Sequence, residues 1–309
     1  MNDVPSNPNG RRSSPGTQDQ SLRMLPLTVW LCSDHATQPD RDSKPSTVPA
    51  PRGATARSAT SRAAEICARH HQYVGCELAR HLISLCTREG DVVVEAFTAS
   101  EATLVAAAEL NRRGLALVPL FPLARHIGSH LRAALPEHRL RRVAMRPCRP
   151  DQMARGLADH LGEVGLVLAA PPPYETGGVP KRRGDRECPA CRAEVWMLGS
   201  EQLGVFLAAA WKVLRPGGVL ALITTARYEG NRLVDPAPRL IRQAQGLGFR
   251  YVQHVIALRV PVEGDRLVVQ AGPADLAELR QVGSRALPPA VRVHADVCLL
   301  QKPRGGGAR

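Results

Sequence analysis

Three consecutive prolines and a tyrosine close an apolar run near the middle of the chain. The stretch "LVLAAPPPYETGG" covers residues 166–178. Proline fixes φ and has no backbone N–H for a sheet ladder, so Pro171, Pro172 and Pro173 are expected to end a buried strand. Tyr174 then follows the carboxyl end of that strand, where open parallel α/β sheets bind their ligands. The sequence therefore predicts a rigid ligand-binding corner that contains Tyr174.

Basic residues follow this corner and also crowd an earlier part of the chain. Lys181, Arg182 and Arg183 lie in "KRRGDR", and residues 111–150 hold nine arginines against one acid, Glu137. The whole chain has 41 Lys and Arg against 28 Asp and Glu, a net charge of +13. Arginine binds phosphate in a bidentate manner, so both segments suit a nucleic-acid backbone. A solvated arginine-rich surface is the alternative.

A pair of cysteines, Cys188 and Cys191 in "CPAC", has the spacing of half a zinc site. A complete site needs two more ligands, which Cys148, His254 or His294 could supply only if the fold brought them close. The eight cysteines are irregularly spaced, which favours reduced thiols in a cytoplasmic protein over a disulfide framework.

Strand and helix signals alternate from Ala63 onward, and a mostly parallel, doubly wound α/β sheet is expected. The expected helices cover residues 77–86, about 100–113, 201–214 and about 238–247. The expected strands cover residues 90–97, 114–120, 141–145, 164–170 and 218–226. Two later apolar runs, residues 249–260 and 291–301, are expected to pair in antiparallel fashion and close the sheet.

The termini differ in composition from this folded part. Residues 1–62 are rich in Pro, Ser, Thr and Arg and are predicted to be largely disordered, with one docked strand at residues 25–32 anchored by Trp30. Residues 63–302 form the predicted domain, and residues 303–309 a second disordered tail. The longest apolar runs fall short of the ~18 residues that a membrane span needs. A cytoplasmic protein without a membrane partner is expected, and the sequence leaves its oligomeric state open.

The proline corner and its neighbours resemble DNA amino-group methyltransferases. The resemblance spans roughly His70 to Lys302 and rests on "PPPY", on "HHQYVGCELARHLISLCTREGDVVVEAF" and on "VLRPGGVLALITT". It implies a seven-stranded, Rossmann-like methyltransferase fold, S-adenosylmethionine as cofactor, and methylation of the exocyclic amine of adenine or cytosine in a flipped base. DNA is the implied partner, and RNA stays open.

The resemblance also implies roles for individual residues. Tyr174 matches the aromatic residue that stacks on the flipped base, and Tyr228 after a later strand is a second stacking candidate. Pro172 and Pro173 match the two prolines of the family motif, and Pro171 stands where the family has a polar acceptor of the amine hydrogens. The positions implied to contact the cofactor are His70, Glu95, Phe97, Ala99, Ser100, Thr103 and Asp151.

The chain departs from the family pattern at four places. Ala99 and Glu101 replace loop glycines, Pro119 replaces the ribose-binding carboxylate, Cys148 replaces the adenine-binding aspartate with Asp151 as a substitute, and Pro171 replaces the acceptor. Two hypotheses follow. The chain is an active methyltransferase with an unusual cofactor pocket, or it is a catalytically inactive nucleic-acid-binding protein of the same fold. A scaffold for protein partners is the third and least favoured hypothesis.

Overall fold

The computed structural model describes residues 29–32, 74–171, 200–229, 232–259, 262–263, 266–267 and 294–304. The helices in these ranges are α1 Cys76–Cys86, α2 Ala102–Glu109, α3 Phe121–Ala134, α4 Glu137–Leu140, α5 Met153–Gly156, α7 Ser200–Val213 and α8 Ala237–Gly246. The strands are β1 Val29–Leu31, β2 Val92–Glu95, β3 Arg113–Leu117, β4 Val143–Arg146, β5 Val164–Ala169, β6 Leu214–Thr224, β7 Arg227–Glu229, β8 Arg232–Val234, β9 Arg250–Leu258, β10 Val262–Glu263, β11 Arg266–Leu267 and β12 His294–Gln301.

A central eight-stranded sheet organises the molecule, with the strand order β1-β9-β12-β6-β5-β2-β3-β4. Five neighbouring strands are mutually parallel, as the alternation of helices and strands predicted. They are β6, β5, β2, β3 and β4. β12 runs antiparallel to both β6 and β9, so the predicted antiparallel closing pair is confirmed. The doubly wound α/β fold is therefore confirmed, and α3 and α4 are additional helices that the sequence reading did not specify.

Part of the N-terminal segment expected to dock as a strand, residues 25–32, is described and forms β1 at residues 29–31. β1 pairs in parallel with β9, and Trp30 lies opposite Ala257. The indole packs against the core cluster beneath α1, with its ring 5.9 Å from the ring of His81. Burial of this apolar side chain explains why so short a strand joins the sheet at its edge.

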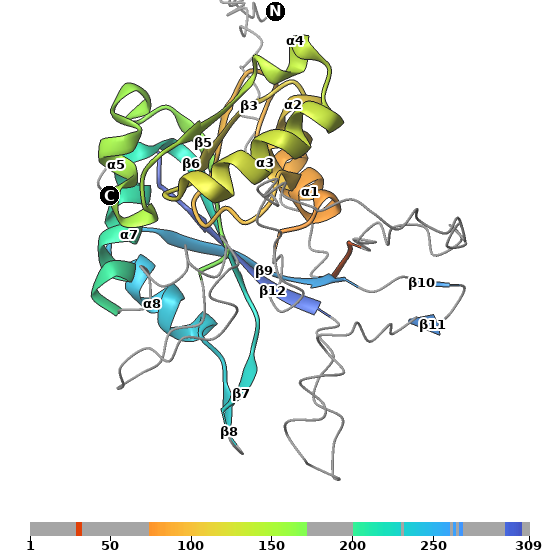
Figure 1. Cartoon of the computed structure of the whole chain (residues 1–309). Helices are drawn as coiled ribbons and strands as arrows, with labels where there is room; N and C mark the ends of the chain where they lie inside the picture. Colours follow the sequence, from red (N-terminus) through yellow and green to blue (C-terminus); the bar gives the residue numbers. More distant parts are fainter. Residues whose placement is uncertain are drawn as a thin grey trace, which may run out of the picture.

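Helices cover both faces of the sheet (Figure 1). α1 and α2 pack on one face over Val93, Leu166 and Ala221, and α3 extends this layer over β3 and β4. α5, α7 and α8 pack on the other face, around Phe206. The central strands β2 and β5 have nearly continuous apolar sequences because both of their faces are buried.

The "RPGG" segment lies differently from the prediction. It was expected to end a helix before a strand beginning at Gly218, but β6 begins at Leu214 and includes the segment. Its pairing with β5 shifts register between Val164 and Leu166. Gly217 has φ +81°, and a Cβ on Gly218 would lie 2.9 Å from two backbone carbonyl oxygens, so both positions require glycine.

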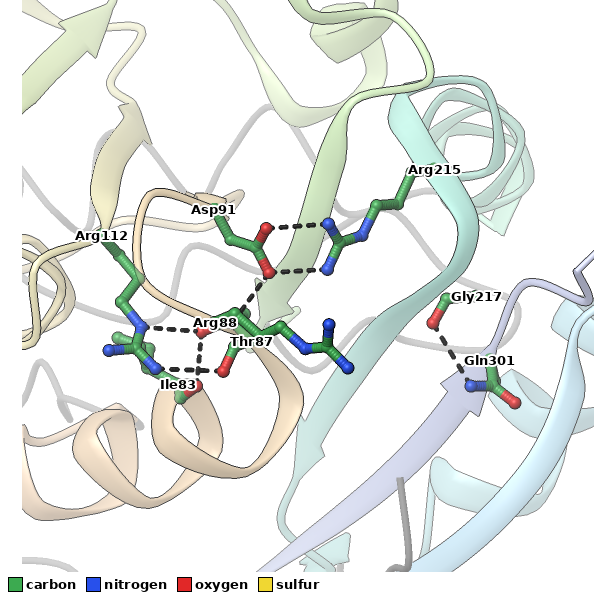
Figure 2. A network of polar contacts seen from close by, with 8 residues as sticks. All are labelled: Ile83, Thr87, Arg88, Asp91, Arg112, Arg215, Gly217 and Gln301. Atoms are coloured by element: carbon green, nitrogen blue, oxygen red, sulfur yellow. Dashed lines mark hydrogen bonds and ion pairs between the residues drawn. The ribbon is translucent and has the colours of Figure 1, made fainter. Parts of the chain in front are cut away.

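The irregular start of β6 joins a polar network at the amino edge of the sheet (Figure 2). The Arg215 guanidinium donates to both oxygens of Asp91, at 2.8 and 2.6 Å, and the Arg88 backbone N–H donates to Asp91 at 2.8 Å. Arg112 donates to the side chain and the carbonyl of Thr87. These contacts connect the ends of α1, β2 and β6 at the edge opposite the one where ligands are expected.

No helix in the described ranges is long and apolar enough to cross a membrane. The five cysteines that they contain, Cys32, Cys76, Cys86, Cys148 and Cys298, are free thiols.

Candidate active site at the carboxyl edge of the sheet

The carboxyl ends of β2 and β5 lie side by side and form the centre of the candidate site. Glu95 at the end of β2 lies opposite Leu168 of β5, and the Ala96 N–H donates to the Leu168 carbonyl at 2.9 Å. Pro171, two residues beyond β5, therefore lies beside the loop that follows β2. This neighbourhood brings Pro171, the first residue of the proline corner, to the loop where the cofactor residues were predicted.

Glu95 is a buried carboxyl group with an unused oxygen. Only 3% of the residue is exposed, and Oε2 makes no hydrogen bond within the described part of the chain. Burial raises the pKa of Glu95 to about 8, the charge of Glu101 adds to this rise, and the nearby Thr103 hydroxyl opposes it. Since an unpaired buried carboxylate is costly, the site favours either a proton on Glu95 or a cationic ligand beside it.

The loop after β2 is ordered by its own side chains. The Thr98 hydroxyl donates to the Glu95 carbonyl at 3.0 Å, and the Ala102 N–H points to Ser100 Oγ at 3.4 Å at the start of α2. Thr103 on α2 is 1% exposed, and its Oγ1 makes no hydrogen bond to any residue that the structure describes. Glu95 and Thr103 thus place two buried oxygens, neither with a hydrogen bond of normal geometry in the described ranges, close together at the same end of the sheet.

The residue that replaces the second loop glycine has a partner on α3. Glu101 Oε1 lies 3.5 Å from Nδ1 of His130. The Glu101 carboxylate thus contacts the α3 layer, while its charge still contributes to the raised pKa of Glu95.

Phe97 and Ala99, both predicted to contact the cofactor, pack in the core. The Phe97 ring meets the ring of Phe206 on α7 edge to face, with centroids 5.0 Å apart. Ala99 packs against the cluster between α2 and α3. These contacts direct both side chains toward the hydrophobic core, and their predicted contact with a cofactor stays a prediction.

Asp151, the predicted substitute for the adenine-binding aspartate, has a partner. Arg149 donates to both of its oxygens, at 3.0 and 2.8 Å, and only 11% of the Asp151 side chain is exposed. A ligand amine would have to share this carboxylate with Arg149. At the end of β3, Pro119 leaves the ribose position without a side-chain hydrogen-bonding group.

Several predicted site residues lie outside the described ranges. They are His70, Pro172, Pro173, Tyr174, Lys181, Arg182, Arg183, Cys188 and Cys191. Tyr228 lies on β7 opposite Leu233 of β8, in a two-stranded antiparallel ribbon that follows the end of β6.

Of the three residues considered as further zinc ligands, Cys148 lies far from the two histidines. Cys148 follows β4 at one end of the sheet, whereas His254 and His294 lie on β9 and β12 near the other end, with β12, β6, β5, β2 and β3 between β9 and β4. Cys148 and these histidines therefore cannot complete one site. No group of three potential metal ligands is present among the residues whose positions are described.

The sequence alone did not reveal one polar cluster near the carboxyl edge of the sheet. His254 Nε2 lies 2.9 Å from Asp296 Oδ1, across the β9–β12 pair. His254 and His294 drew attention only as metal ligands, and Asp296 did not. The alternation of polar and apolar residues along each strand could have indicated that these side chains share a face. The register between β9 and β12 was needed to show that the His254 and Asp296 side chains meet.

Comparisons with known proteins give remote similarities of fold. No protein-family model and no curated protein matches the chain. TrmN from Thermus thermophilus is 17% identical with a TM-score of 0.45, over 75% of this chain and 50% of that one. A SAM-dependent O-methyltransferase from Thermotoga maritima is 12% identical with a TM-score of 0.45, over 78% and 70%. A precorrin-6y C5,15-methyltransferase from Geobacter metallireducens is 13% identical with a TM-score of 0.43, over 73% and 89%.

This chain thus spans about half the length of TrmN. Its own strand order has five parallel strands, then antiparallel β12, then β9 and the edge strand β1, in agreement with the predicted doubly wound, mostly parallel sheet.

Proposed function

We propose that the protein is an S-adenosylmethionine-dependent methyltransferase that acts on the exocyclic amine of adenine or cytosine in nucleic acid, with DNA as the substrate. The observation that carries this proposal is the buried Glu95 carboxyl group, whose Oε2 is unpartnered within the described ranges, beside the end of β5. The proline corner that continues from Pro171 supplies the second argument, through its resemblance to the amino-methyltransferase motif.

The residues at the end of β2 fit one half of the cofactor. S-adenosylmethionine, when bound, supplies a methyl group on a positively charged sulfur. Glu95 would orient the methionine end, because its buried carboxylate favours the ammonium group, and Thr103 offers a second polar atom. The ribose and adenine half has fewer contacts available, since Pro119 has no polar side-chain atom and Asp151 is paired with Arg149.

The second candidate is a nucleic-acid-binding protein of the same fold without catalysis. The Arg149–Asp151 pair and Pro119 favour it, because they remove contacts on which the cofactor would depend. Each such buried hydrogen bond contributes about 0.5 to 1.5 kcal/mol, and more when a charged group takes part. Losing two or three of them would weaken the cofactor by roughly one to three orders of magnitude.

Calorimetry with S-adenosylmethionine and a tritiated-methyl transfer assay on duplex DNA of mixed sequence test the two candidates. We expect a dissociation constant above about 100 μM and slow transfer. Tyr174→Ala should lower the transfer rate by about 10-fold or more, because an aromatic ring contributes about 1–3 kcal/mol when it stacks on a base.

Tyr174→Phe is the matched variant, since it keeps the ring and should retain most of the transfer. Binding of the cofactor without any transfer, or no binding at millimolar concentration, would favour the inactive nucleic-acid-binding protein.

A separate prediction concerns Lys181, Arg182 and Arg183. Replacing all three by alanine should weaken binding to duplex DNA and reduce the slope of log affinity against log salt by about 2 to 3, because each lost phosphate contact removes ~0.9 from that slope. Fluorescence anisotropy at several salt concentrations measures both quantities.

The matched control replaces Arg88 and Lys212, exposed basic residues near the amino edge of the sheet. This double variant should bind DNA with an unchanged salt slope. Equal slopes for the triple variant and the unaltered chain would assign the 181–183 segment to a solvated surface.

A further inference from the structure

The nine arginines between residues 111 and 150 fall into two groups in the structure. Four of them donate to other residues: Arg112 to Thr87, Arg141 to Glu137, Arg146 to Asp159 and Arg149 to Asp151. The guanidinium groups of the other five make no ion pair or hydrogen bond within the described ranges. Of these, Arg139 is half-buried, and the four exposed ones, which we call the basic surface, are Arg113, Arg125, Arg132 and Arg142.

The basic surface follows α3, at the edge of the sheet that β4 forms (Figure 1). α3 connects the carboxyl end of β3 to the amino end of β4, so it runs from one edge of the parallel sheet to the other. Arg125 and Arg132 are two helical turns apart on its exposed face. A Cβ on Gly128 would lie 3.7 Å from Nη1 of Arg132 and 3.5 Å from Met145 of β4, so this guanidinium lies beside the edge strand.

The other two members of the basic surface lie side by side at the amino edge. Gly114 of β3 pairs with Val143 of β4, and the Gly114 N–H donates to the Arg142 carbonyl at 2.9 Å. Arg113 and Arg142 precede these residues on neighbouring chains, about 4.8 Å apart. Like charges at such positions repel each other, and a bound anion would remove the repulsion.

The carboxylates of this region already have partners. α3 contains no acidic residue. Each carboxylate between residues 101 and 150 lies beside another basic group: Glu101 beside His130, Glu109 beside Arg80 and Glu137 beside Arg141. The positive charges of the basic surface are therefore left without a counter-charge in the described part of the chain.

We propose that the basic surface binds the sugar–phosphate backbone of duplex DNA outside the target base pair. This inference rests on the proposed DNA substrate but not on methyl transfer. Guanidinium groups bind phosphate in a bidentate manner. The 14 residues of α3 extend over about 21 Å, which corresponds to roughly six phosphates of one strand. One strand can thus follow the basic surface from the carboxyl edge to the amino edge.

The composition of the exposed face favours nucleic acid over an anionic membrane. A helix that lies on a membrane needs apolar side chains among its basic ones. Between Arg125 and Arg132 the exposed positions are Ser129 and His130, and the exposed Phe121 lies at the start of α3. Polar side chains between arginines are typical of surfaces that contact phosphate and sugar.

Fluorescence anisotropy with duplex DNA of mixed sequence, measured at several salt concentrations, tests the proposal. The variant with Arg125→Ala, Arg132→Ala and Arg142→Ala should bind at least about 10-fold more weakly near 0.1 M salt. Its slope of log affinity against log salt should be smaller by about 2 to 3, because each lost phosphate contact removes ~0.9. If this variant does not fold, glutamine at the same three positions keeps part of each side chain and should give the same result.

The matched control removes the same charge from the helices on the opposite face. Arg155→Ala, Lys212→Ala and Arg242→Ala replace exposed residues of α5, α7 and α8. This triple variant should bind DNA with an unchanged salt slope. Equal losses of slope in the two triple variants would show that only net charge matters and would overturn the inference.

Hydrogen exchange gives a readout that does not depend on affinity. Duplex DNA should slow the exchange of backbone amides in residues 121–142 of the unaltered chain, but not in the Arg125, Arg132 and Arg142 variant. Unchanged affinity and slope in that variant, or its loss of binding to phosphatidylserine vesicles with DNA binding intact, would overturn this inference alone.

Methyl transfer, measured on the same duplex, separates this inference from the proposed function. A chain that binds DNA through the basic surface without transferring a methyl group would support this inference and contradict the proposed catalysis. A chain that does not bind duplex DNA at all would overturn both the inference and DNA as the substrate.

Discussion

Glu95→Gln is expected to raise the free energy of unfolding at pH 8.5 by about 4 kcal/mol relative to the unaltered chain. Burial raises the pKa of Glu95 to about 8, from an ordinary value of 4.5. Between these two values the folded chain holds a proton that the unfolded chain has released, so stability falls as pH rises, by up to about 1.4 kcal/mol per unit. Glutamine has no proton to lose and removes this dependence.

Urea denaturation between pH 4.5 and 8.5 measures the effect. The two chains should differ little at pH 4.5, where Glu95 is protonated in the folded state and about half protonated in the unfolded state, and should diverge steadily above it. Glu137→Gln is the control, since 84% of the Glu137 side chain is exposed. Parallel stability curves for Glu95→Gln and the unaltered chain would contradict the burial of an uncompensated carboxyl group.

The same group predicts how the cofactor should respond to pH. An ammonium ligand beside Glu95 favours its ionised form, so binding of S-adenosylmethionine should release a proton below pH 8. Affinity should then rise by up to about 10-fold per unit between pH 6 and 8 and fall again at higher pH, where the α-amino group of the ligand, with an ordinary pKa of about 8, loses its own proton. Calorimetry in buffers of different ionisation enthalpy would measure the released proton directly, and Glu95→Gln should bind without releasing it.

Asp91→Ala is expected to lower the free energy of unfolding by about 3 kcal/mol. Asp91 accepts two hydrogen bonds from Arg215 and one from the Arg88 backbone, and only 13% of its side chain is exposed. Removing it leaves the guanidinium and the N–H without these acceptors at the point where α1, β2 and β6 meet. Urea denaturation at neutral pH measures the loss.

Arg88→Ala is the matched control for this variant. Its exposed side chain is removed, but the backbone N–H that contacts Asp91 remains, so stability should change by less than about 0.5 kcal/mol. Asp91→Asn should lose less stability than Asp91→Ala, because the amide oxygen still accepts hydrogen bonds. A loss below about 1 kcal/mol for Asp91→Ala would show that solvent replaces these contacts.

Local patterns predicted most elements of the fold correctly. The apolar run that ends at Pro171 became β5, and Trp30 marked a real edge strand, because short apolar runs and prolines act over a few residues. The "RPGG" segment was predicted to precede the strand, but it is part of β6. Its place in β6 depends on Asp91 and on the register with β5, which are far away in the chain.

The sequence by itself determined the order of the elements, the position of Glu95 at the end of a buried strand, and the loss of polar groups at Pro119 and Pro171. These follow from residue type and spacing. Only the tertiary structure decided the partners of the charged side chains: Arg149 with Asp151, His130 with Glu101, and His254 with Asp296. The physical reason is that strand register and helix packing set distances between side chains far apart in the chain, and a carboxylate interacts with whichever cation the fold brings within a few ångströms.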